Sequence, residues 1–300
     1  MSDIFSEPSY AHLFDLTYPD FNNTFDQIIV VIGILFFFCA GFANVFNIPF
    51  ISRSGGLLSY SKFANNVRCG PSVSSRVGMT LLYLPALCLG LLLVTDQTIL
   101  ARPRTYVTAI MITIHFGKRT FECNCVHRYS GQMPFVSAVT ISTFYSLMAF
   151  ICIHYASISG EQHDPIISPE SNVETFEKNT TQIMNTFFSG IVLFLIGQLG
   201  NLYHHYLLAT LRSKGRPIGK YSVPMGGLFS NLGGVACPHY LFELIGWYGI
   251  VIVTKHACIL LFTMGMTVYL IDRSSGQNEW NRKKIDDYDV GRKNMIPYLL

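Results

Sequence analysis

The sequence predicts an all-α membrane protein with about seven transmembrane helices, and three observations support this fold class. Half of the 300 residues are hydrophobic and only 13% are charged, and the mean hydropathy is +0.36, which is too apolar for a soluble domain of this length. Long uncharged stretches recur along the chain, and basic residues gather in alternate connections between them. The formal net charge of +3 comes from 21 basic and 18 acidic residues, a balance that argues against a nucleic-acid-binding surface.

Seven apolar stretches meet or approach the length of about 20 residues that a spanning helix needs. They cover residues 27–52, 77–95, 105–117, 134–156, 182–211, 240–254 and 257–271. The third is short, so it is either a full span, a buried core helix or a re-entrant segment. The last two stretches are joined by a tight hairpin around Lys255 and His256. We therefore expect an N-terminal tail (1–26), a seven-helix membrane domain (27–271) and a C-terminal tail (272–300).

Charged residues predict the orientation in the membrane. Connections on one side, together with the C-terminal tail, hold 17 of the 21 basic residues, whereas the first 26 residues hold five acidic residues and no base. By the positive-inside rule, the N-terminus is lumenal or extracellular and the C-terminus is cytosolic. This parity requires seven passes, which supports the short third span. The N-x-T sequons at Asn22 and Asn179 fall on the predicted lumenal side, in agreement with this orientation.

The eight cysteines indicate neither a disulfide framework nor a metal site. Four lie inside apolar stretches, where we expect them to be small buried side chains: Cys39, Cys88, Cys152 and Cys258. Cys123 and Cys125 form a C-x-C pair without the second pair that a zinc site requires. No metal site is therefore expected.

Polar residues inside the fifth apolar stretch mark a candidate site, because such groups are costly in a bilayer. Asn201, His205 and Arg212 recur at intervals that place them on one face of a helix. This stripe either holds an elongated polar ligand or supplies hydrogen bonds between helices.

Two further groups of polar residues lie at the ends of apolar stretches. His239 and Glu243 are one helical turn apart, and a buried carboxylate there needs a partner to stay ionised. His115, Lys118 and Arg119 end the third stretch and could meet a phosphate or an acidic side chain such as Glu243. Lys118 has the alternative of extending to the membrane interface.

Motifs in the second half of the chain match a known family. They include GNLYHH at 200–205, CPHYLFE at 237–243, and the segments 211–212, 221–229, 286–288 and 292–300, with weaker matches at 76–85, 115–119 and 127–130. On these residues the chain resembles the steroid 5α-reductase (3-oxo-5-alpha-steroid 4-dehydrogenase) family of membrane reductases. Within the family it is most similar to the plant-type branch and the very-long-chain enoyl-CoA reductases. The resemblance covers roughly residues 55–300.

The resemblance implies an enzyme of the endoplasmic reticulum membrane whose NADPH cavity opens to the cytosol and is completed by the C-terminal tail. The positions that match the cofactor-binding residues of the family are Asn201, Arg212, Tyr221, Glu243, Arg273 and Arg292, and we expect Arg119 and His239 to face the same cavity. The arginines can neutralise phosphates, including the 2′-phosphate of NADPH. Asn201 and Glu243 can hydrogen-bond the nicotinamide half.

The chain departs from the family pattern at the catalytic centre. Steroid-reducing members hold the substrate carbonyl with a Tyr on the third helix and a Glu on the second, and the corresponding residues here are Phe116 and Tyr83. We hypothesise that Tyr83 supplies the phenolic donor from the second helix. Tyr83 and Glu243 are therefore the expected catalytic residues.

The activity that the resemblance implies is NADPH-dependent reduction of the C=C bond of an α,β-unsaturated carbonyl lipid, as in steroid metabolism. A trans-2-enoyl-CoA reductase of very-long-chain fatty-acid elongation is the close alternative, and polyprenal reduction is a third. Phe116 and Asn281, where the family usually carries Tyr, leave open a cofactor-binding membrane protein without turnover. The expected partners are a lipid (steroid, enoyl-CoA or polyprenyl compound) and, as a further expectation, other enzymes of lipid synthesis.

Overall fold

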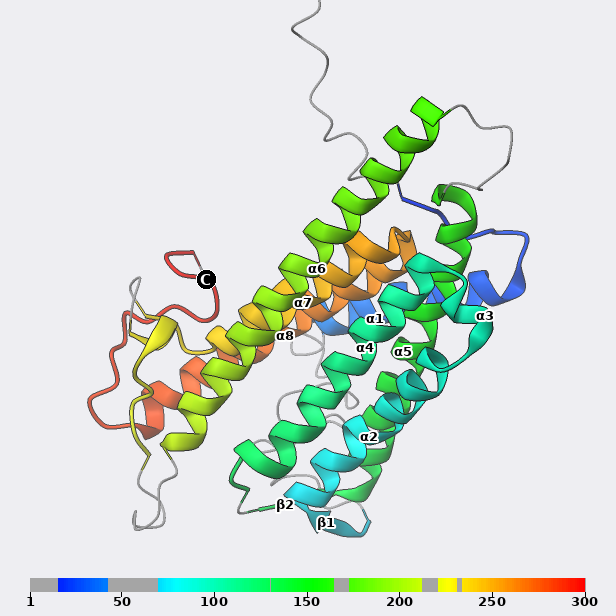
Figure 1. Ribbon diagram of the computed structural model, residues 1–300. Helices are drawn as coiled ribbons and strands as arrows, with labels where there is room; N and C mark the ends of the chain where they lie inside the picture. Colours follow the sequence, from blue (N-terminus) through cyan, green and yellow to red (C-terminus); the bar gives the residue numbers. More distant parts are fainter. Residues whose placement is uncertain are drawn as a thin grey trace, which may run out of the picture.

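The computed structural model describes residues 16–42, 70–129, 131–164, 173–211, 221–230 and 234–299 and is a bundle of helices (Figure 1). Its α-helices are α1 (Thr24–Phe42), α2 (Ser75–Val94), α3 (Gln97–Leu100), α4 (Pro103–Phe121), α5 (Phe135–His163), α6 (Val173–Thr210), α7 (Pro238–Thr254) and α8 (Ala257–Lys284). Two short strands, β1 (Ser72–Ser74) and β2 (Gln132–Pro134), pair antiparallel at one end of the bundle. The helical class is confirmed, and the small sheet was not predicted.

Four helices are long and apolar enough to cross a membrane. They are α2, α5, the Phe187–Thr210 part of α6, and α8, and a shorter apolar helix covers Thr24–Cys39 in α1. In the described part of the chain, α4 and α7 are not among the four. α7 has only 17 residues, and α4 contains three charged side chains, Arg104, Lys118 and Arg119. A membrane protein built from helices is therefore supported, and the seven passes stay a proposal.

Several helices extend beyond the apolar stretches that predicted them. α4 begins at Pro103 and ends at Phe121 rather than covering 105–117, and proline suits the first turn of a helix because its missing N–H has no partner there. α6 begins at Val173, and α8 continues to Lys284, well past residue 271. These extensions are polar, so hydropathy cannot detect them. The end of the first predicted stretch, 43–52, lies outside the described residues.

One of the predictions for cysteine is wrong. Cys152 and Cys258 are buried and Cys39 is half-buried, but Cys88 is exposed on α2. A helix at the periphery of a membrane bundle has apolar residues on its outer face as well as on its inner one, so an apolar run does not identify the buried face.

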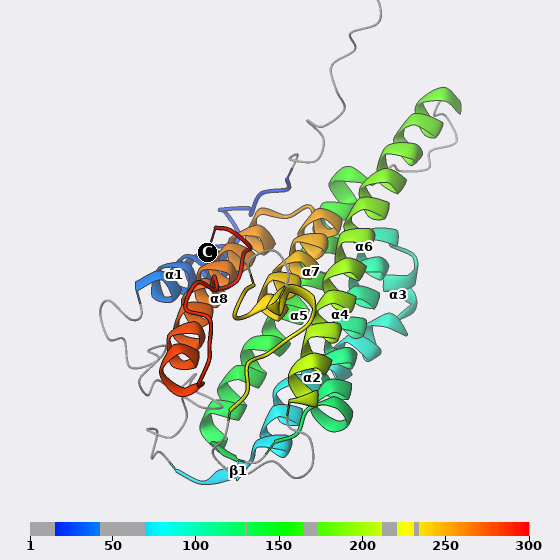
Figure 2. The ribbon, with the colours of Figure 1, turned by 90° about the vertical axis from the view of Figure 1, so that its left-hand side faces the viewer.

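The helices form two groups, α2–α4–α5 and α1–α6–α7–α8. Figure 1 shows α6, α7 and α8 beside α2, α4 and α5, and in Figure 2 α6 and α7 lie in front of α4 and α5. Within the second group, α6 and α7 approach closely at Gly197 and Gly246, where a Cβ atom on Gly197 would collide with the Gly246 backbone. Small residues allow helix backbones to come this close. Because α4 contacts both α6 and α7, polar side chains from all three helices meet between the groups.

The chain after α8 folds back onto the segment that precedes α7. The backbone N–H groups of Ala236 and Cys237 donate to the carbonyl oxygens of Lys293 and Asn294 at 2.8 and 2.9 Å. The Asn278 side chain of α8 donates to the Arg292 carbonyl at 2.9 Å. The predicted C-terminal tail is thus an ordered part of the bundle.

At the other end of α7, the turn to α8 packs against the start of the described chain. Thr17 accepts a backbone hydrogen bond from Ala257 and donates one to Lys255. The His256 ring stacks on Tyr155 with 3.9 Å between ring centroids, and the Tyr155 hydroxyl donates to Asp26 at 2.8 Å. The tight hairpin predicted at Lys255 and His256 is confirmed.

Candidate functional site

Nine polar side chains gather where α2, α4, α6 and α7 meet. This inner polar cluster comprises Tyr83, His115, Lys118, Arg119, Glu122, Asn201, His205, His239 and Glu243. Five of its members are buried, with exposed fractions from 0% to 5%: Tyr83, His115, Glu122, Asn201 and His205. Because unpaired polar groups are costly to bury, their partners show how the site is built.

Arg119 joins α4 to α2. Its Nη2 donates a hydrogen bond to the Tyr83 hydroxyl oxygen at 2.8 Å, and the guanidinium carbon lies 4.9 Å from the centroid of the Tyr83 ring. The Tyr83 ring also stacks on Tyr145 at 5.4 Å. Phe116, which replaces the expected Tyr, packs into the same aromatic group. The hydroxyl that contacts Arg119 therefore comes from α2, and the catalytic role of Tyr83 stays a prediction.

Glu122 is fully buried and lies directly after α4, at the start of a π-helical turn (Glu122–Val126). Its Oε2 accepts from Arg119 Nη1 at 2.7 Å and lies 3.0 Å from His205 Nδ1, while its Oε1 lies 3.3 Å from Lys118 Nζ. Burial acts to raise the pKa of this carboxyl group, but Arg119, His205 and Lys118 outweigh burial and hold the pKa well below its ordinary value. Glu122 is therefore ionised.

Asn201 connects α4, α6 and α7. Its side-chain oxygen accepts a hydrogen bond from Lys118 Nζ, and its Nδ2 donates to the His239 carbonyl at 2.8 Å. The alternative that Lys118 extends to the membrane interface is wrong, because Asn201 and Glu122 hold its ammonium group inside the bundle. Both polar ends of Asn201 contact the protein, which favours its role as a bridge between helices.

Glu243 lies against His115, as the sequence suggested. His115 Nε2 is 3.4 Å from Glu243 Oε1, and His115 Nδ1 is 3.2 Å from the side-chain nitrogen of Gln198. An amide nitrogen can only donate, so Nδ1 accepts and Nε2 carries the hydrogen toward Glu243. One turn before Glu243, His239 Nδ1 is buried without a hydrogen-bond partner among the described residues.

Three other predicted cofactor residues, Tyr221, Arg273 and Arg292, lie on α8 or contact it, and together they are called the C-terminal cluster. Arg292 donates to the Pro224 carbonyl at 3.0 Å and lies 5.1 Å from the centroid of the Tyr288 ring. Arg273 donates to the hydroxyl oxygens of Tyr240 and Tyr269 at 3.3 and 3.4 Å. Tyr221 is half exposed, and its ring meets Trp280 edge to face at 4.7 Å.

The two clusters are adjacent along α7. Tyr240, which contacts Arg273, directly follows His239 of the inner polar cluster, and their rings are 4.3 Å apart. The structure thus brings Tyr83, Arg119, Asn201, His239 and Glu243 together, with Arg273 next to them. Arg212, the remaining predicted cofactor residue, lies outside the described residues.

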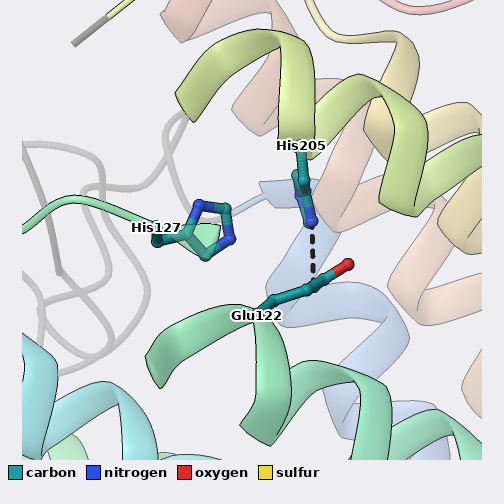
Figure 3. Close-up of side chains that lie close together, drawn as sticks. All are labelled: Glu122, His127 and His205. Carbon is teal, nitrogen blue, oxygen red and sulfur yellow. Dashed lines mark hydrogen bonds and ion pairs between the residues drawn. The ribbon is translucent and has the colours of Figure 1, made fainter. Parts of the chain in front are cut away.

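The sequence analysis missed Glu122 and His127. These residues and His205 could offer three metal ligands, whose atoms lie within 4.8 Å of one another (Figure 3). Arg119 and Lys118 already contact the Glu122 carboxylate, however, and their positive charges oppose a divalent cation there. The sequence does contain a sign of this ion-paired carboxylate: Glu122 lies four residues after Lys118 and three after Arg119, spacings that allow ion pairs on a helix.

Comparison with known proteins identifies the family. A profile of the family described as "3-oxo-5-alpha-steroid 4-dehydrogenase" matches residues 132–300. The chain belongs to the 3-oxo-5-alpha-steroid 4-dehydrogenase family. This is a family of oxidoreductases that act on CH–CH groups with NADP, and its matched region contains α5 to α8 and the C-terminal cluster.

The relatives of the chain are named as two kinds of reductase, very-long-chain enoyl-CoA reductases and steroid 5-alpha-reductases. The chain is 24% identical over 200 residues to the probable very-long-chain enoyl-CoA reductase art-1 of Caenorhabditis elegans, covering 66% of this chain and 60% of that protein. It is 30% identical over 114 residues to 3-oxo-5-alpha-steroid 4-dehydrogenase 1 of Rattus norvegicus, covering 38% and 42%. The match thus spans less than two thirds of the length of either protein. The chain is also 23% identical to the steroid 5-alpha-reductase DET2 of Gossypium hirsutum over 77% of this chain and 84% of that protein.

Proposed function

We propose that the protein is a membrane reductase that uses NADPH to reduce the C=C bond of an α,β-unsaturated carbonyl lipid. Membership of the family supports this reaction class. The observation that carries the proposal is the hydrogen bond between Arg119 and Tyr83 in the inner polar cluster. The Tyr83 side chain is buried, and Arg119 is half-buried. A hydroxyl beside a fixed positive charge is suited to stabilise the negative charge that develops on a carbonyl oxygen.

The residues of the two clusters fit NADPH. His239 Nδ1 is a buried polar atom without a partner among the described residues, so this part of α7 has unused hydrogen-bonding capacity. Arg273 and Arg292 can bind phosphate groups, and the half-exposed Tyr221 can stack on an aromatic ring. When bound, NADPH would supply the hydride for the β-carbon of the substrate.

The protein's own groups would act on the carbonyl end of the substrate. The Tyr83 oxygen accepts from Arg119, and we propose that its hydroxyl group donates to the carbonyl oxygen of the bound substrate. The guanidinium stabilises the oxygen of Tyr83 as the hydroxyl hydrogen shifts toward the substrate. Glu243 holds His115 through its Nε2–H, and both residues would orient the nicotinamide half of the cofactor.

A trans-2-enoyl-CoA reductase is the second candidate, because relatives with this name are also similar to the chain. The chain is 28% identical over 196 residues to the very-long-chain enoyl-CoA reductase of Dictyostelium discoideum and 24% identical over 230 residues to 3-oxo-5-alpha-steroid 4-dehydrogenase 1 of Bos taurus, so the extent of similarity does not favour one substrate over the other. An enone and an enoyl thioester both place developing charge on a carbonyl oxygen, so the same donor would serve either substrate.

We also propose the location. Seven helices, α1, α2 and α4–α8, would cross the endoplasmic reticulum membrane with the N-terminus lumenal and the C-terminus cytosolic. The positive-inside distribution of bases supports this orientation, and both clusters would then lie toward the cytosolic side.

The test is NADPH oxidation by the detergent-purified protein with either a 3-oxo-Δ4 steroid or a long-chain trans-2-enoyl-CoA. We expect turnover of one of them, and a large loss in Glu243→Gln. The matched control is Glu161→Gln, because Glu161 forms an exposed ion pair with Arg102. Arg102 directly precedes α4, at the end of the helix opposite to Lys118 and Arg119. Binding of NADPH without reduction of either lipid would contradict the proposal.

A further inference from the structure

Glu122 and Tyr83 contact opposite nitrogens of one guanidinium group. Arg119 Nη1 donates to Glu122 Oε2 at 2.7 Å, and Arg119 Nη2 donates to the Tyr83 oxygen at 2.8 Å. A guanidinium is planar and its N–H groups point in fixed directions. Fixing one nitrogen therefore determines where the other nitrogen points.

Glu122 is well placed to fix Arg119. It is 0% exposed, and it is three residues from Arg119 across the junction between α4 and the π-helical turn. Its other contacts, Lys118 and His205, come from two different helices. The carboxylate is thus held by Lys118 and His205 as well as by Arg119.

Arg119 Nη1 also lies 3.0 Å from His205 Nδ1, so loss of the Glu122 charge would remove the charged one of its two partners. Lys118 and Arg119 are neighbours in sequence, and both contact Glu122. Without the carboxylate, Lys118 and Arg119 would keep Glu243 as an acidic neighbour but lose the group that contacts both, and in a poorly solvated site the repulsion between the two positive charges is strong. The guanidinium would turn away from Lys118, and its contact with Tyr83 would be lost.

We propose that Glu122 is a positioning residue that orients Arg119 toward the Tyr83 hydroxyl, so that its effect on catalysis passes through Tyr83. The part of this proposal that concerns turnover rests on the proposed function. The part that concerns orientation does not, and it can be tested without any substrate.

The first test reports on Tyr83 directly. 3-Fluorotyrosine is incorporated at position 83 of the full chain, and its 19F resonance is recorded in the wild-type background, in Glu122→Gln and in the control Glu161→Gln. We expect the resonance to move in Glu122→Gln only, because the hydrogen bond from Arg119 is lost. An unchanged resonance in folded Glu122→Gln would overturn the proposal. If that variant does not fold, Glu122→Asp keeps the charge with a shorter reach and is expected to shift the resonance too; no shift would overturn the proposal equally.

The second test is a double-mutant cycle on turnover. We expect Glu122→Gln to lower kcat about 10- to 100-fold, less than removal of the donor itself, with little change in KM for the lipid. In the Tyr83→Phe background the same substitution should change kcat by less than about three-fold, because coupled residues are not additive. Additive losses would mean that Glu122 acts independently of Tyr83. If the wild-type protein reduces neither lipid, the proposed function fails, and the 19F shift alone decides the orientation.

Discussion

Arg119 donates a hydrogen bond to the hydroxyl oxygen of Tyr83 across the interface between α4 and α2. The hydrogen bond thus connects two residues that are far apart in the chain.

If Tyr83 polarises the substrate carbonyl, Tyr83→Phe removes the donor without changing the packing of the ring. We expect kcat to fall about 100-fold or more, as for other oxyanion donors, with NADPH affinity nearly unchanged. Steady-state kinetics and NADPH fluorescence check this.

The control for Tyr83→Phe is Tyr206→Phe, which removes a hydroxyl from the exposed outer face of α6, where the residue is 58% exposed. It should keep wild-type turnover. Full activity of Tyr83→Phe would exclude Tyr83 from the chemistry and move the donor to another residue.

Arg119→Lys tests whether the shape of the side chain matters in addition to its charge. A lysine cannot reach Tyr83 and Glu122 with two fixed N–H groups at once. We expect kcat to fall at least about 10-fold, because the fork geometry rather than the charge alone holds the Tyr83 hydroxyl. Arg102→Lys, in an exposed ion pair with Glu161, is the matched control. Equal turnover of the two variants would show that charge alone suffices.

Gly197→Ala tests the close crossing of α6 and α7. The new methyl group would collide with the Gly246 nitrogen, so the helices must separate. Overpacking of this kind costs about 1–3 kcal/mol, and it would also move Asn201 away from the His239 carbonyl. We expect a lower Tm and weaker NADPH binding. Gly117→Ala is the control, since its methyl group would meet Leu87 at an ordinary 3.6 Å; the same loss in both variants would argue against a special role of the crossing.

His256 predicts an acid-sensitive component of stability. Its ring is buried, and burial lowers its pKa from 6.5 to about 4, although Asp26 opposes this shift. In the unfolded chain the imidazole binds a proton below pH 6.5, whereas in the folded protein it does so only below about pH 4. The free energy of unfolding therefore falls as the pH drops from about 6.5 to about 4.

The substitution His256→Asn isolates this component. Asparagine keeps an acceptor for the Cys258 N–H at the start of α8 but does not titrate. The apparent Tm of the wild-type protein in detergent should fall more steeply as the pH is lowered from neutral toward the folded-state pKa of about 4 than that of His256→Asn. Parallel curves would show that His256 does not contribute.

Hydropathy predicted a helix best where an apolar core reaches the length of a membrane span, as in α2, α5, α6 and α8. It failed at the helix ends. Residues 272–284 of α8 are polar on average and were assigned to a tail, yet they continue the helix and bring Asn278 against the C-terminal segment. Local polarity does not reveal that a segment is ordered by contacts with residues far along the chain.

The candidate site was predicted in part. The sequence placed His239 one turn before Glu243 and left open whether the group of His115, Lys118 and Arg119 meets a phosphate or Glu243; in the structure it is His115 that lies against Glu243. Glu122 was missed because it follows the predicted end of the third span and was counted with a cytosolic connection. The longer α4 and the π-helical turn carry it back into the bundle. The burial of this carboxylate depends on contacts with helices far along the chain, such as that with His205 of α6, so the local sequence does not predict it.

The segment that precedes α7 receives its backbone partners from Lys293 and Asn294, which are synthesised after every helix of the bundle. During translation, α7 and α8 can therefore enter the membrane while residues 234–237 still lack these hydrogen bonds, since chains fold as they are made. The C-terminal cluster, with Arg292 beside Tyr288, can assemble only when residues 288–294 have emerged from the ribosome. A nascent protein stalled before residue 292 would therefore have its helices inserted while the C-terminal cluster is still incomplete.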